Sequence, residues 1–475
     1  MFSLLTPISG GEYVAFSKRG EKHIAMPLDS GKKVAMGAQR QRDFLRAGIV
    51  TVLALGLGVA ATMAPAAATV RVGSATDGAK AESDVRNITY RQWTSDADFA
   101  TGTSDHVAAV GGSLTMSGAD GTTSYTDPFG TAGPRSYDFA TWISPSVAVG
   151  FPATEAIASW NATTPGGTWL KVELRGTTAA GTTTKWYVLG LWAAGDEEIH
   201  RTSVPSQGDA DGFVAIDTFV AAAGHALTSY QVQATLYRPV GTTETPTLRS
   251  IGTMASAVPG PKRRPVASPG TGVVAPLTVP QYSQEIHIGE YPEYDGGGEA
   301  WCSPTSTSMV VASWGTGPTP ADYEWVDDSI VDPFVDHAAR MTYDYNYQGA
   351  GNWPFNTAYA STFGLDGFVT RLRSIDEVQQ FIGAGIPLVL SLAMKKNEVP
   401  GAGYTTNGHL LVVVGFTVTG DAVINDPFAP TNADVRKVFS RAEFENAWLN
   451  TSGGVVYVIH PSGVALPPAP AQANW

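Results

Sequence analysis

The chain has 475 residues, of which 43% are hydrophobic, and its formal net charge is −13 at neutral pH. The excess of acidic side chains excludes nucleic acid as an expected partner, because binding to phosphates requires a basic surface. A chain of this length exceeds what one hydrophobic core usually holds, so we expect more than one domain.

The beginning of the chain has the order of an export signal. Arginines between Arg40 and Arg46 precede the almost wholly apolar stretch 47–63, and three alanines follow at 66–68. This order predicts a secretory signal, so residues 1–68 are assigned to export and not to the fold. The apolar stretch ends in a cleavage pattern, so no stable membrane span is expected after cleavage, and a retained anchor is the alternative. We expect a secreted protein, in solution or associated with the cell wall.

Residues 69–257 have the pattern of short strands. In TWLKVELRG, hydrophobic residues alternate with charged ones, and KWYVLGLW, YQVQATLYR and TPTLRS behave similarly between turns rich in Gly and Thr. Alternation with a period of two predicts strands with one buried face. Many such strands with scarcely a helical period predict an all-β sandwich domain.

Tryptophans in this predicted sandwich allow two interpretations. They are Trp160, Trp169, Trp186 and Trp192. Core packing is the commoner use of tryptophan in such a domain, and we favour it. A sugar-stacking face is the alternative, which would make a cell-wall or carbohydrate ligand the partner of this domain.

Two segments near the centre and the end of the chain differ in composition from the rest. Residues 258–280 contain six prolines and no periodic hydrophobic pattern, which is typical of a linker. Residues 465–475 form a tail rich in Pro and Ala. Between them, residues 281–464 are predicted to form a second domain.

The second domain shows helices first and strands later. Pro304, Pro333 and Pro354 each fit the first turn of a helix. Two further helices are predicted by Ser-x-x-Glu capping boxes, one at Ser374 with Glu377 and one at Ser440 with Glu443. The apolar runs IPLVLSLAM, HLLVVVGFTV, DAVINDP and GVVYVIH predict strands, and Thr-Gly-Asp between the second and third predicts an antiparallel hairpin. Helices segregated from an antiparallel sheet indicate an α+β domain.

Cys302 is the only cysteine of the chain. A single thiol in an exported chain cannot form a disulfide within that chain, so its conservative interpretation is a small buried apolar residue. However, Cys302 lies two residues before Pro304, at the start of a predicted helix. Unpaired backbone N–H groups at that end favour a thiolate, which is the reactive form of cysteine.

A thiolate nucleophile requires a partner that exchanges protons with the substrate. His409 begins the predicted strand HLLVVVGF, and Asp426 ends the neighbouring strand in VINDPF. An imidazole held by a carboxylate beside a thiolate is the arrangement needed for acyl transfer. We favour Asp426 as the residue that orients His409, with Asn425 as the alternative, because alternation puts the two on opposite faces of the strand.

At these residues the chain resembles a known family. VPQYSQ, WCSPTSTSMV, GHLLVVVGF, VINDP and SRAEFENAW resemble the papain-like domains of the bacteriocin-leader-processing cysteine peptidases, family 39 of that class, over residues 279–460. The resemblance implies that Cys302 is the nucleophile, His409 the base and Asp426 the acid. It also implies that a glutamine upstream donates to the oxyanion, and Gln284 matches better than Gln281.

The resemblance has two limits. The family usually has Cys-Gly-Pro where this chain has Cys302-Ser303-Pro304. Leader-processing members are fused to membrane transporters, and none accompanies the resemblance here, so their double-glycine substrate is not carried over. What carries over is a cysteine peptidase that hydrolyses peptide bonds in a peptide or protein substrate.

Three other functions compete with this prediction. A peptidoglycan peptide amidase would use the same cysteine and histidine. A non-catalytic protein that binds cell wall or glycan would use the papain-like domain as a scaffold. Carboxylate pairs for glycoside cleavage are available among neighbouring acidic residues, although such clusters are more often solvated. Histidines 287, 337, 409 and 460 show no His-x-x-x-His spacing, so the sequence predicts no metal site and no cofactor.

Overall fold

The structure is a computed structural model that describes residues 7–8, 12–13, 85–260, 267–270, 272 and 274–475. Most of the predicted export segment 1–68, including its apolar stretch 47–63, lies outside these residues. Two short strands, β1 (Pro7–Ile8) and β2 (Glu12–Tyr13), pair with each other in antiparallel fashion. Within the described residues, we find no helix with the length and hydrophobicity needed to cross a bilayer.

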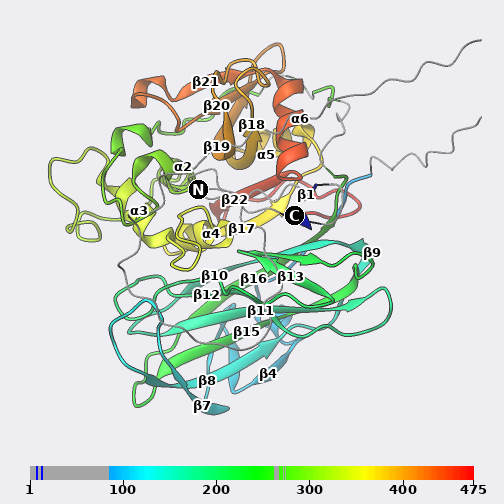
Figure 1. The fold of residues 1–475 in the computed structure, drawn as a ribbon, viewed down its shortest axis with the longest axis vertical. Helices are drawn as coiled ribbons and strands as arrows, with labels where there is room; N and C mark the ends of the chain where they lie inside the picture. The colour runs from blue at the N-terminus through cyan, green and yellow to red at the C-terminus, as the bar shows by residue number, and fades with distance from the viewer. Residues whose placement is uncertain (1–6, 9–11, 14–84, 261–266, 271, 273) are drawn as a thin grey trace, which may run out of the picture. The chain divides into compact units, whose positions relative to one another are not determined.

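Most of the regular structure is β-sheet, with few helices, and it divides into an N-terminal half (residues 85–257) and a C-terminal half (residues 274–475) (Figure 1). The elements of the N-terminal half are β3 (Asn87–Trp93), α1 (Asp96–Phe99), β4 (Thr103–Asp105), β5 (Val107–Val110), β6 (Ser113–Met116), β7 (Gly121–Tyr125), β8 (Arg135–Ile143), β9 (Val147–Ala153), β10 (Glu155–Thr163), β11 (Trp169–Thr178), β12 (Tyr187–Trp192), β13 (Gly212–Ala215), β14 (Thr218–Ala221), β15 (Leu227–Pro239) and β16 (Thr247–Ala257).

These strands form two antiparallel seven-stranded sheets. One has the order β13-β14-β10-β16-β6-β5, with β3 also pairing with β16. The other has the order β12-β11-β15-β8-β4, with β7 pairing with β8 and β9 with β15. The alternating run lies in β11, at the inside of the second sheet, where Lys171 and Arg175 are less buried than the hydrophobic residues, as predicted. Glu173 is buried instead, with Lys171 Nζ 3.0 Å from its carboxylate, so the predicted period of two is interrupted there.

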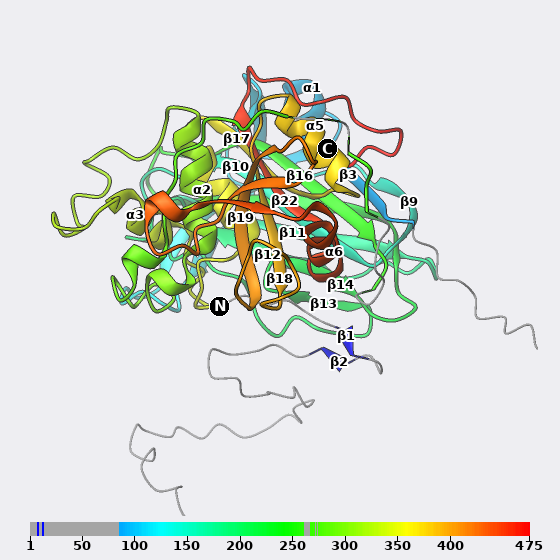
Figure 2. The ribbon, with the colours of Figure 1, turned by 90° about the horizontal axis from the view of Figure 1, so that it is seen from above.

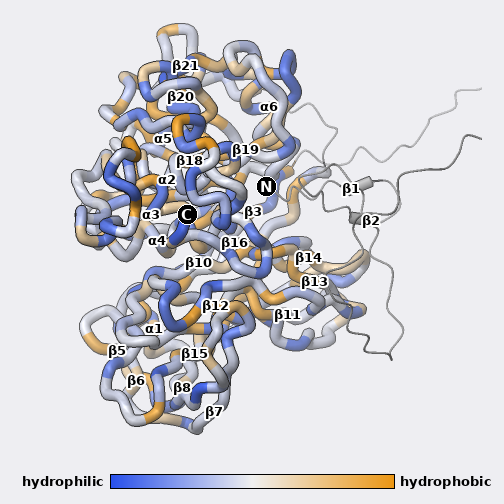
Figure 3. Tube along the Cα trace, turned by 60° about the vertical axis from the view of Figure 1, so that its left-hand side comes forward, coloured by the Kyte–Doolittle hydropathy of each residue, from blue (hydrophilic) through white to orange (hydrophobic). Residues whose placement is uncertain are grey.

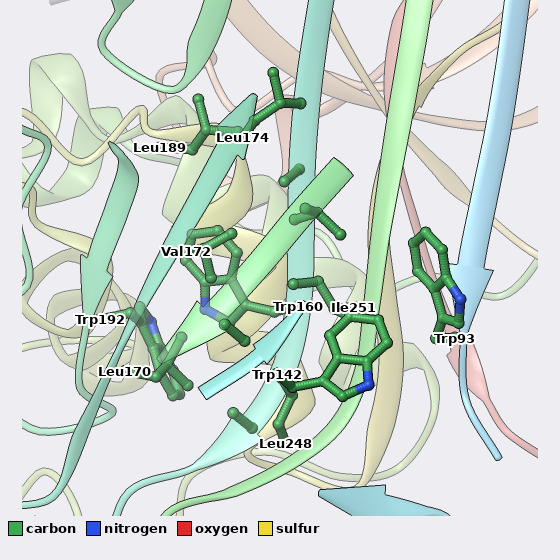
Figure 4. Packing of buried hydrophobic residues seen from close by; sticks show 14 of the residues in the cluster. Trp93, Trp142, Trp160, Leu170, Val172, Leu174, Leu189, Trp192, Leu248 and Ile251 are labelled. Carbon is green, nitrogen blue, oxygen red and sulfur yellow. The ribbon is translucent and has the colours of Figure 1, made fainter. Parts of the chain in front are cut away.

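Residues from both sheets meet in one hydrophobic cluster (Figure 4). Tryptophans carry much of its volume, including Trp142 of the second sheet and Trp160 of the first, both fully buried. Trp169 and Trp192 are buried as well, whereas Trp186 is partly exposed beneath the Arg175 guanidinium, 4.6 Å from its ring centroid. Three of the four candidate sugar-stacking rings therefore pack inside the protein.

The C-terminal half combines helices with one β-sheet. Its elements are η1 (Glu285–His287), η2 (Gly298–Ala300), α2 (Cys302–Ser313), α3 (Pro333–Thr342), α4 (Trp353–Ser361), β17 (Leu365–Arg371), α5 (Ile375–Gly383), β18 (Leu388–Met394), β19 (Thr406–Phe416), β20 (Ala422–Asn425), η3 (Asn432–Asp434), β21 (Arg436–Phe439), α6 (Arg441–Thr451) and β22 (Val455–Pro461). The sheet is antiparallel and six-stranded, in the order β17-β22-β18-β19-β20-β21. The predicted hairpin between β19 and β20 is confirmed.

Both faces of this sheet are covered. From β19, Leu410 and Val412 join a buried cluster that includes Cys302 and Met309 of α2, and α2 packs beside β19 (Figure 2). The alternate residues of β19, such as Leu411, join a second cluster that includes residues of α5 and α6. A strand buried on both faces needs hydrophobic residues at successive positions, which explains the continuous run HLLVVV. Figure 3 shows hydrophobic and hydrophilic residues interspersed along the chain.

Both predicted capping boxes are wrong, although both helices start where expected. The Ser374 side chain makes no capping hydrogen bond to α5, and the Glu377 carboxylate accepts the N–H of Arg373 instead, at 2.7 Å. In α6, the Ser440 hydroxyl donates to the Glu443 carboxylate and leaves the helix N–H groups uncapped by side chains. In both helices the carboxylate accepts a hydrogen bond from another donor and not from the N-cap backbone N–H.

Hydrogen bonds join the two halves. The Arg201 side chain is fully buried in the N-terminal half and donates to the Arg340 carbonyl at 2.7 Å. The Asp344 carboxylate accepts from the Ser203 N–H at 3.0 Å and from the Asn352 amide at 2.9 Å. Because these groups are buried, the Arg201 guanidinium and the Asp344 carboxylate each take part of their hydrogen bonding from across the boundary.

Segments predicted as linker and tail also contact the C-terminal sheet and helices. The Ser268 N–H donates to the Glu445 carboxylate at 2.7 Å, and the Leu277 N–H donates to the Val414 carbonyl at 2.8 Å. In the tail, Asn474 is fully buried and donates to the Arg371 carbonyl at 2.8 Å. The described parts of both segments are thus held by specific hydrogen bonds.

Candidate active site

Cys302 is the first residue of α2, as the position of Pro304 predicted. Its side chain is 1% exposed, and its sulfur accepts the backbone N–H of Leu410 at 3.2 Å. The sulfur therefore lies where two sources of positive potential meet, the N-terminus of α2 and a backbone dipole of β19.

His409 lies directly before Leu410 on β19, which places its ring beside the same sulfur. Its Nε2 lies 2.7 Å from Asp426 Oδ1, and its side chain also hydrogen-bonds the Cys302 side chain. Since Nε2 faces the carboxylate, Nδ1 is the nitrogen left to face the sulfur. Burial lowers the pKa of His409, but the Cys302 sulfur and the Asp426 carboxylate outweigh burial and raise that pKa to about 10.

The Asp426 carboxylate is fully buried and has a partner on every side. Oδ1 also accepts the Phe428 N–H at 3.0 Å, while Oδ2 accepts from the Tyr404 hydroxyl at 3.1 Å and from Lys437 Nζ at 2.8 Å. Burial raises the pKa of Asp426, but the opposite effects of His409 and then Lys437 together outweigh burial, so the pKa is lowered. A carboxylate held in this way stays charged and fixes the orientation of the imidazole.

Asn425 points away from the imidazole. Its amide donates to the Pro280 carbonyl at 2.9 Å, and its oxygen accepts from Arg436 Nε at 2.6 Å. The alternation of side chains along β20 thus brings Asp426, and not Asn425, to His409. Asn425 instead joins the strand hairpin to the segment before η1.

Gln284 lies immediately before η1 and is 2% exposed. Its backbone N–H donates to the Pro427 carbonyl at 3.0 Å, which ties it to the loop that follows Asp426. Its side chain hydrogen-bonds the Glu285 carboxylate, and its own Oε1 is buried with no hydrogen-bond partner. The Oε1 of Gln281 is likewise buried and unpartnered, so burial alone does not choose between the two glutamines.

Sequence reasoning missed several groups that surround the candidate residues. Lys437 and Tyr404 hold Asp426, and the Leu410 N–H contacts the sulfur. Glu285 is close enough for His409 and Asp426 to act on its pKa, which burial and Glu299 raise. A backbone N–H leaves no trace in the sequence, but Lys437 pairs with Ile424 across the β20–β21 ladder, so strand register would have placed it near Asp426.

Ser303 stands where the resembling family usually has glycine. It is fully buried inside the first turn of α2, and its hydroxyl lies 2.9 Å from the Tyr457 hydroxyl on β22. The serine therefore has a hydrogen-bond partner and a helical backbone, so the position does not require glycine here.

A cavity of about 790 Å³ lies elsewhere in the molecule. Residues of both halves line it, including Asp217, Arg371 and Thr451, and none of Cys302, His409 or Asp426 does. The candidate residues are instead covered, since His409 is only 4% exposed and the rings of Tyr404 and Phe428 lie 5.6 and 6.5 Å from its ring. The candidate catalytic residues therefore do not line this cavity.

Comparisons with known proteins agree with the two halves described above. A model of the peptidase C39 N-terminal domain matches residues 89–256, and a model of the Peptidase_C39-like family matches residues 276–456. One similar solved structure comes from Bacillus anthracis and is described provisionally as a C39-like peptidase. It is 16% identical, the match covers 38% of this chain and 96% of that chain, and the TM-score is 0.25. No curated protein matches the chain.

The second match contains Cys302, His409 and Asp426, and the first accounts for the sheets that precede them. Together the two matches span most of the chain, in the order in which its halves are built. The N-terminal half therefore matches the peptidase C39 N-terminal domain, and the C-terminal half, with the candidate residues, matches the Peptidase_C39-like family.

Proposed function

We propose that this protein is an exported cysteine peptidase that hydrolyses peptide bonds, with Cys302 as nucleophile, His409 as acid and base, and Asp426 as the residue that orients His409. The observation that carries the proposal is the buried chain of contacts Cys302–His409–Asp426, in which the imidazole lies between a sulfur and a fully satisfied carboxylate. A histidine kept only for packing gains nothing from facing a thiol at a helix N-terminus.

The arrangement supports acyl transfer in two steps. The Cys302 thiolate attacks the carbonyl carbon of the substrate, and the imidazolium of His409 gives its proton to the departing amine nitrogen as the C–N bond breaks. Water then attacks the thioester while His409 takes its proton, and the C–S bond breaks to release the acid and the thiolate. The Cys302 N–H and the Gln284 amide would donate to the oxyanion in both steps.

For the architecture, we propose a papain-like α+β domain over residues 281–464 preceded by a β-sandwich over residues 69–257. The clusters on both faces of the C-terminal sheet and the two sheets sharing one core support these assignments. The sandwich is proposed to act mainly as a partner of the peptidase domain, since most of its tryptophans are buried. A peptide or protein substrate outside the cell is the proposed target.

The test is hydrolysis by the full chain of two substrates, casein and purified cell wall, with Cys302→Ala as the inactive control. Release of new amino termini from casein, absent with Cys302→Ala, is the expected result. Release from cell wall alone would redirect the proposal to a peptidoglycan peptide amidase. No release from either substrate, together with iodoacetamide labelling that is slow and independent of His409, would support a non-catalytic scaffold and end the proposal.

The oxyanion assignment has its own test, in which the two glutamines serve as matched controls. Removal of one oxyanion donor typically lowers kcat by about 100- to 1000-fold, and we expect that loss for Gln284→Ala. Gln281→Ala should change kcat little. The opposite ranking would transfer the role to Gln281.

A further inference from the structure

A second cluster of a histidine and acidic residues lies outside the candidate active site. His287 ends η1, Glu290 follows it by one turn, and Asp336 lies in α3. His287 Nδ1 is 2.8 Å from Glu290 Oε2 and 3.1 Å from Asp336 Oδ2. One nitrogen and two carboxylates from two separate segments thus converge, with all three ligand atoms within 4.8 Å of one another.

The carboxylate of Asp336 is buried without the partners that such a group needs. Its side chain is 0% exposed, and apart from the His287 ring 3.1 Å from Oδ2, neither oxygen has a hydrogen-bond donor within the described residues. The Nε2 of His287 is also buried without a partner, and no described Lys or Arg forms an ion pair with any member of the cluster. A buried carboxylate is costly unless a positive group or several donors compensate it.

We propose that His287, Glu290 and Asp336 form a binding site for a divalent transition-metal ion of the Zn²⁺ or Mn²⁺ kind. Metal bonds of about 2.1 Å at right angles put neighbouring ligand atoms roughly 3.0 Å apart, and the two nitrogen-to-oxygen distances lie close to that value. An imidazole among the ligands favours such ions over Ca²⁺ and Mg²⁺, which prefer oxygen alone.

Such an ion compensates the buried carboxylates, since a double positive charge meets two negative ones. Glu290 is partly exposed, at 25% of its side chain, so water reaches the cluster and can complete the coordination. The sequence predicted no metal site because it offers no His-x-x-x-His spacing. The ligands here are instead a His-x-x-Glu pair and an aspartate contributed by a distant helix.

The ion would fasten the segment that carries Gln284. The His287 N–H donates to the Gln284 carbonyl at 3.1 Å, and η1 follows Gln284 directly. Asp336 belongs to α3, which packs on α2. A metal shared by η1 and α3 therefore holds the loop before Cys302 against the helix that Cys302 begins, without taking part in the reaction.

The experiment uses the full chain after chelation and dialysis. Titration with ZnCl₂ and, separately, MnCl₂ is followed by calorimetry, bound metal is counted by plasma mass spectrometry, and melting is recorded with and without metal. We expect one ion per chain and a higher Tm with metal. Loss of one of three ligands should weaken binding by at least about 100-fold in Asp336→Asn, judging from the 10- to 100-fold cost of losing outer-shell partners alone.

Three further variants serve as controls for metal binding. Glu290→Gln, at the partly exposed ligand, should also weaken binding and serves if Asp336→Asn does not fold. Asp105→Asn changes the exposed cluster of Asp105, His106 and Asp120 and should leave binding unchanged. Cys302→Ala should bind metal normally, which separates this proposal from the proposed peptidase. Absence of binding, or binding that Asp105→Asn abolishes and the other variants leave intact, would overturn the site.

Discussion

Two buried histidines of the C-terminal half face carboxylates in different ways. At His409, the Asp426 carboxylate has donors on both oxygens, and its charge is fully compensated by protein groups. At His287, the Asp336 carboxylate lies 3.1 Å from the imidazole and close to a second carboxylate, Glu290, with no other donor among the described residues. The comparison teaches that a compensated carboxylate orients a proton carrier, whereas an uncompensated one calls for a cation from outside the chain.

Replacing each histidine by glutamine should separate the two sites most strongly. His409→Gln removes the group that exchanges protons with substrate, so we expect kcat/KM to fall by about 1000-fold or more. His287→Gln should lower Tm in the presence of metal and leave kcat/KM within a few-fold at temperatures where it is folded. Steady-state kinetics and melting curves of the two variants check these expectations. An equal loss of kcat/KM in both variants would contradict the assignment of different roles to the two histidines.

Replacing Asp426, the carboxylate beside His409, should lower kcat much more than replacing Asp336, the carboxylate beside His287. Asp426→Asn keeps the shape but loses the charge that orients the imidazole, and we expect kcat to fall by about 100-fold or more. Asp336→Asn, measured under identical conditions, should retain most of its kcat. A comparable loss of kcat in both variants would show that Asp336 acts on the chemistry.

The pH dependence follows from the direction of the two shifts. His409 has a pKa raised to about 10, so its protonated form, and the stability gained from pairing it, persists through neutral pH and is lost as the pH rises through about 10. Asp426 has a lowered pKa, so its contribution is present at neutral pH and is lost only as the pH falls below its ordinary range. We expect kcat/KM to fall by roughly tenfold per pH unit above 10, and a fall that begins near pH 7 would contradict the pairing.

Among the changes at the candidate active site, replacement of Lys437 should have the smallest effect on catalysis. It supports Asp426 without touching His409, so Lys437→Met should lower kcat/KM by less than about tenfold. Because Lys437 lowers the pKa of Asp426, its loss should move the acid limb of the pH profile to higher pH. Lys396→Met, at an exposed position, is the matched control and should leave both limbs in place.

The sequence was most informative where one local rule decides the structure. Proline at the first turn located α2 and placed Cys302 correctly at its first residue. Continuous hydrophobicity located β19, but the prediction that His409 begins this strand is wrong, because the strand begins at Thr406. Strand β17 escaped notice because it contains Gly367, usually a strand breaker. In the structure a Cβ at Gly367 would lie 2.6 Å from the Thr357 carbonyl, so glycine there permits α4 to approach the sheet.

Features that depend on contacts between distant segments could not be predicted. Asp336 joins His287 only because α3 folds back on η1, and Lys437 reaches Asp426 only through the register of β20 and β21. The capping boxes failed for a related reason, because the glutamates met other donors in the folded chain. Local spacing gives the candidates, and the packing of the chain selects among them.

Asp344 has a consequence for the history of the chain. Its buried carboxylate is completed by the Ser203 backbone and hydroxyl, which belong to the other half. Recombination that replaced residues 85–257 with an unrelated module would leave this charge short of two donors. A substitute for the N-terminal half would therefore restore all the hydrogen bonds of this carboxylate only if it again offered an amide and a hydroxyl at that point.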